Sequence, residues 1–225
     1  MCSKICTNVL SRRLAPFLFA VVLFFFSRNL LKDNLVLYAL LKCSPILSLY
    51  WFAQTVQFQV FDKTKIVSLK YLNIGLIFSC IGDILLVWPA TFLYGIGAFA
   101  LAHVMYIGYF EMNPRNNALG AVLVVMNLIV FLVVSSTISG ILLMAVLIYS
   151  HLLIGTVWRS LDQALHCKDK KIWSVCGAVG SLLFCFSDLM IAVTMFLHPI
   201  PYSEVLIMST YYAGQLGIAL STLRY

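Results

Sequence analysis

Residues 71–110 read YLNIGLIFSCIGDILLVWPATFLYGIGAFALAHVMYIGYF, and this stretch decides the fold class. It holds two apolar runs, 71–88 and 91–110, which are separated by the turn Trp88-Pro89-Ala90-Thr91. Each run has about the 20 residues that an α-helix needs to cross roughly 30 Å of hydrocarbon. A turn this short requires the two helices to pack side by side in opposite directions. The stretch therefore predicts an antiparallel pair of membrane-spanning helices.

The same pattern continues along the whole chain. Of its 225 residues, 62% are hydrophobic and only 10% are charged, so a soluble protein would need an implausibly apolar surface. We therefore expect an all-α polytopic membrane protein of about eight transmembrane helices, with residues 1–225 forming a single integral membrane domain. Apolar windows predict spans near 14–31, 35–56, 71–88, 91–110, 118–135, 138–160, 172–197 and 202–223.

Lys and Arg residues occur in short groups between the apolar segments. The net charge is +7. We interpret these basic residues as signals that orient the helices in the membrane and as contacts to lipid headgroups, and we expect no nucleic-acid interface. Lys4, Arg12 and Arg13 precede the first apolar run without a convincing cleavage site, so we expect an uncleaved span rather than a signal peptide. Only Arg28 and Lys32 fall on the side opposite the termini, and this bias predicts cytoplasmic N- and C-termini. The basic residues assigned to the cytoplasmic side are Lys4, Arg12, Arg13, Lys63, Lys65, Lys70, Arg115, Arg159, Lys168, Lys170, Lys171 and Arg224.

The two halves of the chain resemble each other weakly. Cys80-Ile81-Gly82-Asp83 in the third span is similar to Cys185-Phe186-Ser187-Asp188 in the seventh. A 4+4 parallel repeat would place Asp83 and Asp188 in equivalent positions, facing each other across an axis along the membrane normal. A chance match between short apolar segments explains the similarity equally well.

Five ionisable residues lie inside the predicted spans: Lys42, Asp83, His103, His151 and Asp188. Each costs at least about 2.5 kcal/mol in hydrocarbon and therefore calls for an explanation. The rise per residue of a helix places most of them in one layer, in the outer half of the membrane. Two carboxyl groups and a Lys at compatible depth indicate a functional site, with Asp83 and Asp188 as its chief residues. For His151 we favour an interhelical hydrogen bond.

Other polar and small residues share the helix faces of this group. Gly82 precedes Asp83 and Ser187 precedes Asp188 among small residues at helical spacing, which allows neighbouring helices to approach closely. In the last span, Tyr211 and Gln215 stand one turn apart and can line the same cavity. In the second span, Pro45 follows Lys42 by three residues. A kinked or unwound segment there would widen a pocket.

Three other interpretations of these residues remain open. Lys42 could pair with one Asp, with the other Asp protonated, so that the cluster only locks helices together. His103, His198 and an Asp could hold zinc, although their spacing does not match that of known zinc motifs. The polar cluster could also serve a small-solute or lipid transporter, which would need a polar path through the other half of the membrane.

The chain resembles the YhhN-like membrane proteins, a family that includes the animal lysoplasmalogenases. The similarity extends over the second to eighth spans. The matching residues are Lys42-Cys43-Ser44-Pro45, Gly82-Asp83-Ile84-Leu85-Leu86, Gly95 with Phe99, Ala102-His103 and Tyr106, Gly180 with Phe184 and Ser187-Asp188, and Tyr211-Tyr212 with Gln215. Ser44 departs from the apolar residue expected before the proline.

This resemblance implies hydrolysis of the vinyl ether bond of lysoplasmalogens, giving a fatty aldehyde and glycerophospho-ethanolamine or glycerophospho-choline. It also implies an endoplasmic reticulum membrane. A vinyl ether is hydrolysed by protonation on carbon, so we expect one of Asp83 and Asp188 to be the general acid and the other the base or electrostatic partner. No cofactor or metal is expected; the expected partners are a lysophospholipid substrate, membrane lipids and, as one candidate assembly, a homodimer. The expected supporting residues are Lys42, His103, Tyr106, Tyr211, Tyr212, Gln215, Ser187 and Gly82.

Overall fold

The structure, a computed structural model, describes residues 2–31, 33–111, 116–167 and 170–225. Within these ranges the chain forms helices and no strand. Three short elements accompany the longer helices: η1 (Pro89–Thr91) and η3 (Ser221–Arg224) are 3₁₀ turns, and η2 (Val193–Leu197) is a π-helical turn. The α-helices are α1 (Cys2–Ser27), α2 (Leu35–Gln57), α3 (Lys63–Leu85), α4 (Phe92–Tyr109), α5 (Asn117–Ser135), α6 (Gly140–His166), α7 (Lys171–Ala192) and α8 (Ser203–Leu220).

Seven of the described helices, all but α8, are long and apolar enough to cross a bilayer. Helix α8 occupies the predicted eighth position in the chain, but it is less apolar because it carries Glu204, Tyr211, Tyr212 and Gln215. The polytopic all-α prediction is therefore confirmed, with seven spans by this criterion and an eighth helix packed among them.

Several helices extend beyond the apolar windows that predicted them. Helix α3 begins at Lys63, where residue 71 was predicted, because Asp62 caps it by accepting hydrogen bonds from the hydroxyl and N–H of Thr64. These two bonds also hold the pKa of the Asp62 carboxyl below its ordinary value. Helix α6 continues to His166, beyond the predicted end at residue 160. Apolar windows locate the buried part of a helix and miss polar turns that project from the membrane.

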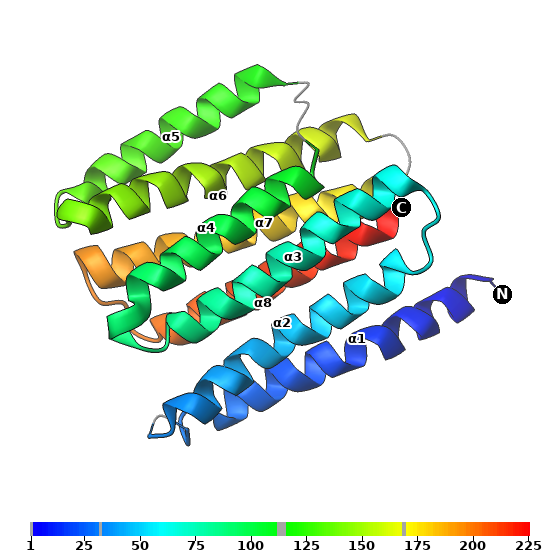
Figure 1. Cartoon of the computed structure of the whole chain (residues 1–225), viewed down its shortest axis with the longest axis horizontal. Helices are drawn as coiled ribbons and strands as arrows, with labels where there is room; N and C mark the ends of the chain where they lie inside the picture. The colour runs from blue at the N-terminus through cyan, green and yellow to red at the C-terminus, as the bar shows by residue number, and fades with distance from the viewer. Residues whose placement is uncertain (1, 32, 112–115, 168–169) are drawn as a thin grey trace.

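Six helices form a closed ring. Contacts run in the order α2, α3, α4, α6, α7 and α8, and α8 returns to α2. Helix α1 packs against α2 and helix α5 against α6, so these two lie outside the ring, on opposite sides of it (Figure 1). The predicted catalytic and supporting residues all belong to ring helices.

Helices α7 and α8 make the closest approach in the ring. A Cβ atom at Gly180 would lie 2.6 Å from the carbonyl oxygen of Gly214, and one at Gly214 would lie 2.8 Å from the backbone nitrogen of Phe184. Neither contact could be relieved by moving a flexible side chain, because both partners are backbone atoms. The two glycines therefore let α8 lie directly against α7.

Helix α2 stays α-helical through Pro45, so the structure contains no unwound segment there. The proline lacks an N–H for the carbonyl of Leu41, four residues earlier. The hydroxyl of Ser44 donates to that carbonyl at 2.9 Å instead. The serine that departs from the family pattern thus satisfies the carbonyl that Pro45 leaves free.

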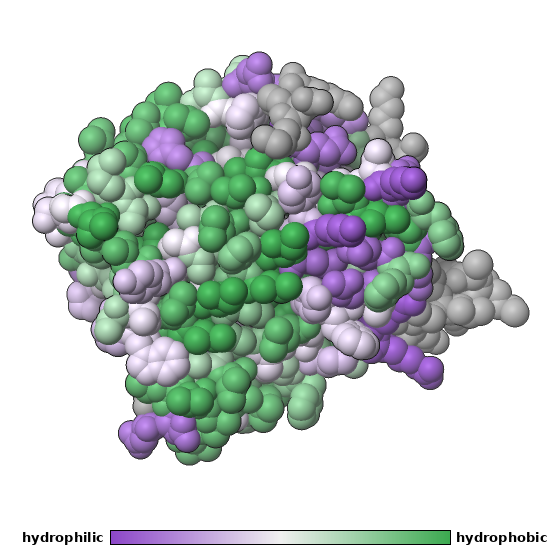
Figure 2. All heavy atoms as spheres, viewed as in Figure 1, coloured by the Kyte–Doolittle hydropathy of each residue, from purple (hydrophilic) through white to green (hydrophobic). Residues whose placement is uncertain are grey.

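Both chain termini lie at the same end of the bundle (Figure 1). We call the opposite end, where α1, α3 and α7 end and α2, α4 and α8 begin, the distal face. Figure 2 shows apolar residues over much of the visible face, with hydrophilic residues gathered toward the end that carries the termini. Lys32, Arg115 and Lys168 from the predicted charge bias lie outside the described residues.

Candidate active site

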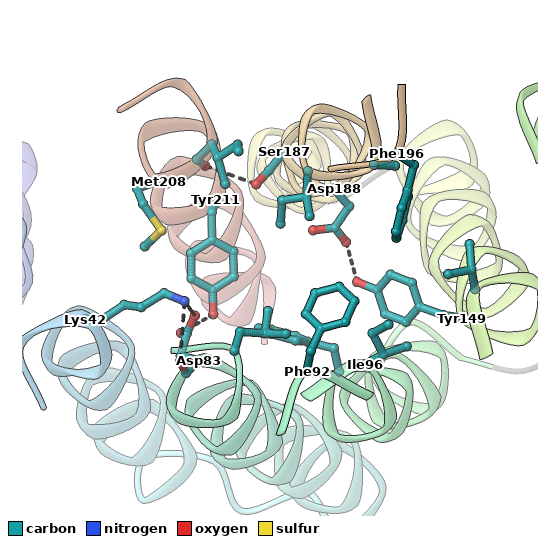
Figure 3. A pocket seen from close by; sticks show the side chains of 16 residues that line it. Lys42, Asp83, Phe92, Ile96, Tyr149, Ser187, Asp188, Phe196, Met208 and Tyr211 are labelled. Atoms are coloured by element: carbon teal, nitrogen blue, oxygen red, sulfur yellow. Dashed lines mark hydrogen bonds and ion pairs between the residues drawn. The ribbon is translucent and has the colours of Figure 1, made fainter. Parts of the chain in front are cut away.

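A mostly apolar cavity of about 110 Å³ opens inside the ring, toward the distal face. Both carboxyl residues selected from the sequence, Asp83 and Asp188, line it, as do Lys42, Ser187 and Tyr211. The close-up places Asp83, Lys42 and Tyr211 on one side of the cavity and Asp188 on the other (Figure 3). The apolar lining comes mainly from Leu86, Phe92, Ile96, Phe99, Val146, Ile191, Ala192, Phe196, Ile207 and Met208.

Asp83 is nearly fully buried and uses both carboxylate oxygens. Its Oδ1 lies 3.4 Å from Nζ of Lys42, and its Oδ2 accepts a 2.7 Å hydrogen bond from the hydroxyl of Tyr211. Lys42 also reaches the backbone carbonyl of Asp83 at 3.4 Å. A cation and a phenol therefore support this carboxylate from two neighbouring helices, α2 and α8.

A buried polar network continues beneath Tyr211. The side-chain amide of Gln215 lies 3.4 Å from the Tyr211 hydroxyl and donates to the hydroxyl of Ser79 at 3.0 Å. The hydroxyl of Tyr106 donates to Oε1 of Gln215 at 2.9 Å and lies 3.1 Å from Ser79. Because these groups satisfy one another, they fix the orientation of Tyr211 and, through it, of Asp83.

Asp188 has a different environment. Its Oδ2 accepts a hydrogen bond from the hydroxyl of Tyr149 in α6. That hydroxyl also lies 3.4 Å from Nε2 of His103, whose Nδ1 lies 3.1 Å from the hydroxyl of Thr156. Among the described residues Asp188 forms no ion pair, and its second oxygen, Oδ1, makes no hydrogen bond with them. Asp188 therefore has one partner, a phenol, whereas Asp83 has both a phenol and a cation.

Three predicted site residues, Tyr212, Ser187 and Gly82, hold the walls of the cavity in place, and of these only Ser187 also lines it. Tyr212 donates to the backbone carbonyl of Lys42 at 2.8 Å, and Ser187 donates to that of Ile207 at 3.0 Å. A Cβ atom on Gly82 would lie 2.5 Å from the ring of Phe99. These contacts hold helices of the ring together and so fix the shape of the cavity.

The two remaining histidines considered in the sequence stand apart from the cavity. His151 bonds the carbonyl of Leu147 at 2.8 Å and lies 3.5 Å from the amide of Asn127 in α5, as expected for an interhelical contact. His198 is exposed, while His103 is buried against Thr156. Among the described residues, no group of three or more His, Cys, Asp or Glu side chains has a geometry that could hold a metal.

Sequence reasoning missed Tyr149 and Thr156. Tyr149 lines the cavity and holds Asp188, and Thr156 orients His103. Both belong to α6, in which His151 was selected because it is ionisable. A usable signal was present, since Tyr149 and Thr156 stand seven positions apart and so share one face of α6.

The geometry suits proton transfer to an apolar ligand. Two carboxyl groups with unlike surroundings line one mostly apolar cavity, which is the arrangement that lets one act as an acid while the other stays ionised. The free oxygen of Asp188 can carry a transferable proton, whereas both oxygens of Asp83 are already engaged. The apolar lining fits a hydrocarbon chain.

The chain matches one protein-family model and several named proteins. The model of the YhhN family matches residues 37–222. The chain is 32% identical over 213 residues to Lysoplasmalogenase TMEM86B of Mus musculus, which covers 95% of this chain and 87% of that protein. It is 35% identical over 188 residues to Lysoplasmalogenase TMEM86A of Bos taurus, which covers 81% of this chain and 77% of that protein. No solved structure matches the chain.

Proposed function

Because this chain belongs to the YhhN family, we propose that it is a lysoplasmalogenase, a hydrolase that cleaves the vinyl ether bond of lysoplasmalogens. Its products are a fatty aldehyde and glycerophospho-ethanolamine or glycerophospho-choline. The observation that carries the proposal is the pair of carboxyl groups, Asp83 and Asp188, in unlike surroundings of one apolar cavity. The named activity of the relatives supports the substrate.

Asp188 is the general acid of the proposed reaction. Tyr149 holds its Oδ2, so that Oδ1 carries the proton and faces the cavity. An apolar cavity without a cation beside this residue favours the neutral carboxyl. The acid transfers its proton to the vinyl carbon farther from the ether oxygen, the C=C electron pair forms the new C–H bond, and an oxocarbenium ion results.

Asp83 is the electrostatic partner. Its carboxylate, fixed by Lys42 and Tyr211, faces the positive charge that develops on the oxocarbenium ion. Water then adds to the cationic carbon and gives a proton to the Asp188 carboxylate, which restores the acid. The hemiacetal collapses by breaking its bond to the glycerol oxygen, which takes up the hydroxyl proton as the aldehyde leaves.

The reaction is tested with purified protein in detergent by measuring release of the water-soluble glycerophospho product and by identifying the hydrocarbon product as aldehyde, alcohol or fatty acid. Three substrates with the same headgroup are compared: the 1-alkenyl lysolipid, the 1-alkyl ether and the 1-acyl ester. We expect product from the alkenyl lipid alone, because only a vinyl ether has a carbon that can accept the proton. In D₂O the aldehyde should carry one deuterium at the carbon next to the carbonyl. Hydrolysis of the acyl ester instead would refute the assignment.

The membrane and orientation complete the proposal. We place the chain in the endoplasmic reticulum membrane, as the family resemblance implies, with both termini in the cytoplasm. Most described basic residues of the loops stand on the side of the termini, whereas Arg28 stands on the distal face, and this bias supports the orientation. A glycosylation acceptor inserted in the 198–202 connection should be modified, and modification of an acceptor added after Tyr225 instead would reverse the orientation.

A further inference from the structure

A second cavity, of about 460 Å³, lies beside the first and nearer to the distal face. The two share six lining residues, so the second is a vestibule to the site. The shared residues are Lys42, Leu86, Phe92, Ile191, Ile207 and Met208. The vestibule adds residues from the ends of the helices, among them Tyr38, Thr194 and Glu204. A lipid whose vinyl ether lies at Asp188 would therefore have its headgroup in the vestibule.

Glu204 is the one carboxylate among the described residues that line the vestibule, and Lys42 is the one cation. Arg28 in the α1–α2 connection pairs with Oε2 of Glu204 at 2.9 Å, and the hydroxyl of Tyr38 donates to Oε1 at 3.0 Å. The Glu204 side chain nevertheless remains 36% exposed. Its carboxylate is thus oriented from two sides and still open to a ligand.

Thr194 adds an unused polar group to the same wall. Its hydroxyl is buried and has no hydrogen-bond partner among the described residues. It belongs to the π-helical turn η2, where His198 N–H bonds the Val193 carbonyl five residues earlier. Such turns occur often at functional sites. Because Thr194 lines the vestibule, a change of its χ1 rotamer would aim the free hydroxyl at a phosphate oxygen there.

Resting on the proposed function, we propose that Glu204 binds the ammonium group of the substrate headgroup and so selects headgroups that carry a cation. Glu204 precedes Tyr211 by seven residues in α8, about 10 Å along the helix axis. This separation suits an extended glycerophosphoethanolamine, whose vinyl ether end lies at Asp83 and Asp188. The headgroup phosphate then lies between Lys42 and Thr194, and its negative charge complements Lys42.

The aromatic ring of Tyr38 favours the same occupant. It lines the vestibule and donates its hydroxyl to Glu204, so an ammonium group at the carboxylate also lies near the ring. Cations are attracted to aromatic faces whether or not they can donate hydrogen bonds. The site therefore accepts both a primary ammonium, as in ethanolamine, and a quaternary one, as in choline.

The test compares wild type with Glu204→Gln on three alkenyl lysolipids, bearing phosphoethanolamine, phosphocholine or phosphate alone. We expect KM to rise about three- to tenfold for the two ammonium lipids, as for one partly exposed ion pair. For the phosphate lipid KM should stay the same or fall, because a repelling carboxylate is removed. Glu204→Asp should restore part of the selectivity. Asp33→Asn, which removes an exposed carboxylate from the α1–α2 connection, is the matched control and should keep the wild-type KM values.

Two results would overturn the inference. One is an equal loss on all three lipids, which indicates a structural role for the Arg28–Glu204 pair. The other is a Glu204→Gln protein whose KM values for all three lipids equal those of the wild type. Calorimetric binding of glycerophosphocholine to the wild type and to Glu204→Gln separates this inference from the reaction itself. Weaker binding by the variant supports the headgroup site even if the wild type releases no aldehyde, an outcome that would refute the proposed function alone.

Discussion

The hydroxyl of Tyr211 donates a 2.7 Å hydrogen bond to Oδ2 of Asp83, joining α8 to α3 across 128 positions of sequence. Asp188 is held in the same manner by Tyr149 of α6. The two carboxyl groups differ in that Asp83 also pairs with Lys42 at 3.4 Å. This single cation makes the pair asymmetric, which favours Asp83 as the ionised partner and Asp188 as the acid.

Replacing Tyr149 by Phe should lower kcat about tenfold. The ring stays, but one hydrogen bond to Asp188, of about 1.5 kcal/mol, is lost and the acid is less well oriented. KM should change little, since the apolar lining is preserved. The measurement is the rate of aldehyde release at several substrate concentrations. Tyr94→Phe removes an exposed hydroxyl from α4 and should behave as wild type. A Tyr149→Phe protein that releases aldehyde at the wild-type rate would show that Tyr149 does not assist the acid.

Replacing Lys42 by Met should destabilise the protein by about 3 kcal/mol, because the buried Asp83 carboxylate loses its cation. The double variant with Asp83→Asn should recover part of that loss, since no charge then remains unpaired. Thermal unfolding of the four proteins in one detergent forms a double-mutant cycle. Simple addition of the two single effects would mean that Lys42 and Asp83 are not coupled.

Gly180→Ala should lower the unfolding midpoint, at a cost of about 1 to 3 kcal/mol, because its Cβ atom would lie 2.6 Å from the Gly214 carbonyl oxygen. Gly97→Ala is the control, since no atom lies within 4 Å of a Cβ there. Alanine forms helix better than glycine by about 1 kcal/mol, so Gly97→Ala should be neutral or stabilising. Equal effects at the two positions would contradict the close packing of α7 and α8.

Extensive dialysis against a chelator should leave aldehyde release unchanged. The proposed steps use the Asp188 proton and the Asp83 charge, and His103 is engaged with Thr156 and Tyr149. Activity is measured before dialysis, after it, and after addition of zinc. Loss on dialysis with recovery on zinc addition would support the alternative in which His103, His198 and an Asp hold zinc.

The core of the site could be read from the sequence because charges are scarce in an apolar chain. Asp83, Asp188 and Lys42 stand out against 62% hydrophobic residues, and all three line one cavity. The helical spacing of Tyr211 and Gln215 put them on one face, and the two side chains lie 3.4 Å apart. The prediction that both line one cavity was wrong, because Tyr211 lines it whereas Gln215 lies in the polar network beneath Tyr211. The internal 4+4 repeat remains a prediction.

Other features depended on contacts between distant segments. Tyr149 carries no charge and stands in an apolar helix, and its contact with Asp188 depends on the packing of α6 against α7. Helix α2 is unbroken through Pro45, and the Ser44 hydroxyl replaces the backbone donor that the proline lacks. Hydrophobic periodicity carries no sign of this contact. Glu204 lay at the edge of a predicted span, and its pairing with Arg28 joins segments far apart in the chain.

The most direct test of the central claim is the rate of aldehyde release by Asp188→Asn. The amide keeps the size of the side chain but has no transferable proton, so we expect kcat to fall about 100-fold or more. The unfolding midpoint should stay near that of wild type, and Asp188→Glu should recover part of the rate. A well-folded Asp188→Asn protein that releases aldehyde at nearly the wild-type rate would contradict the assignment of Asp188 as the acid.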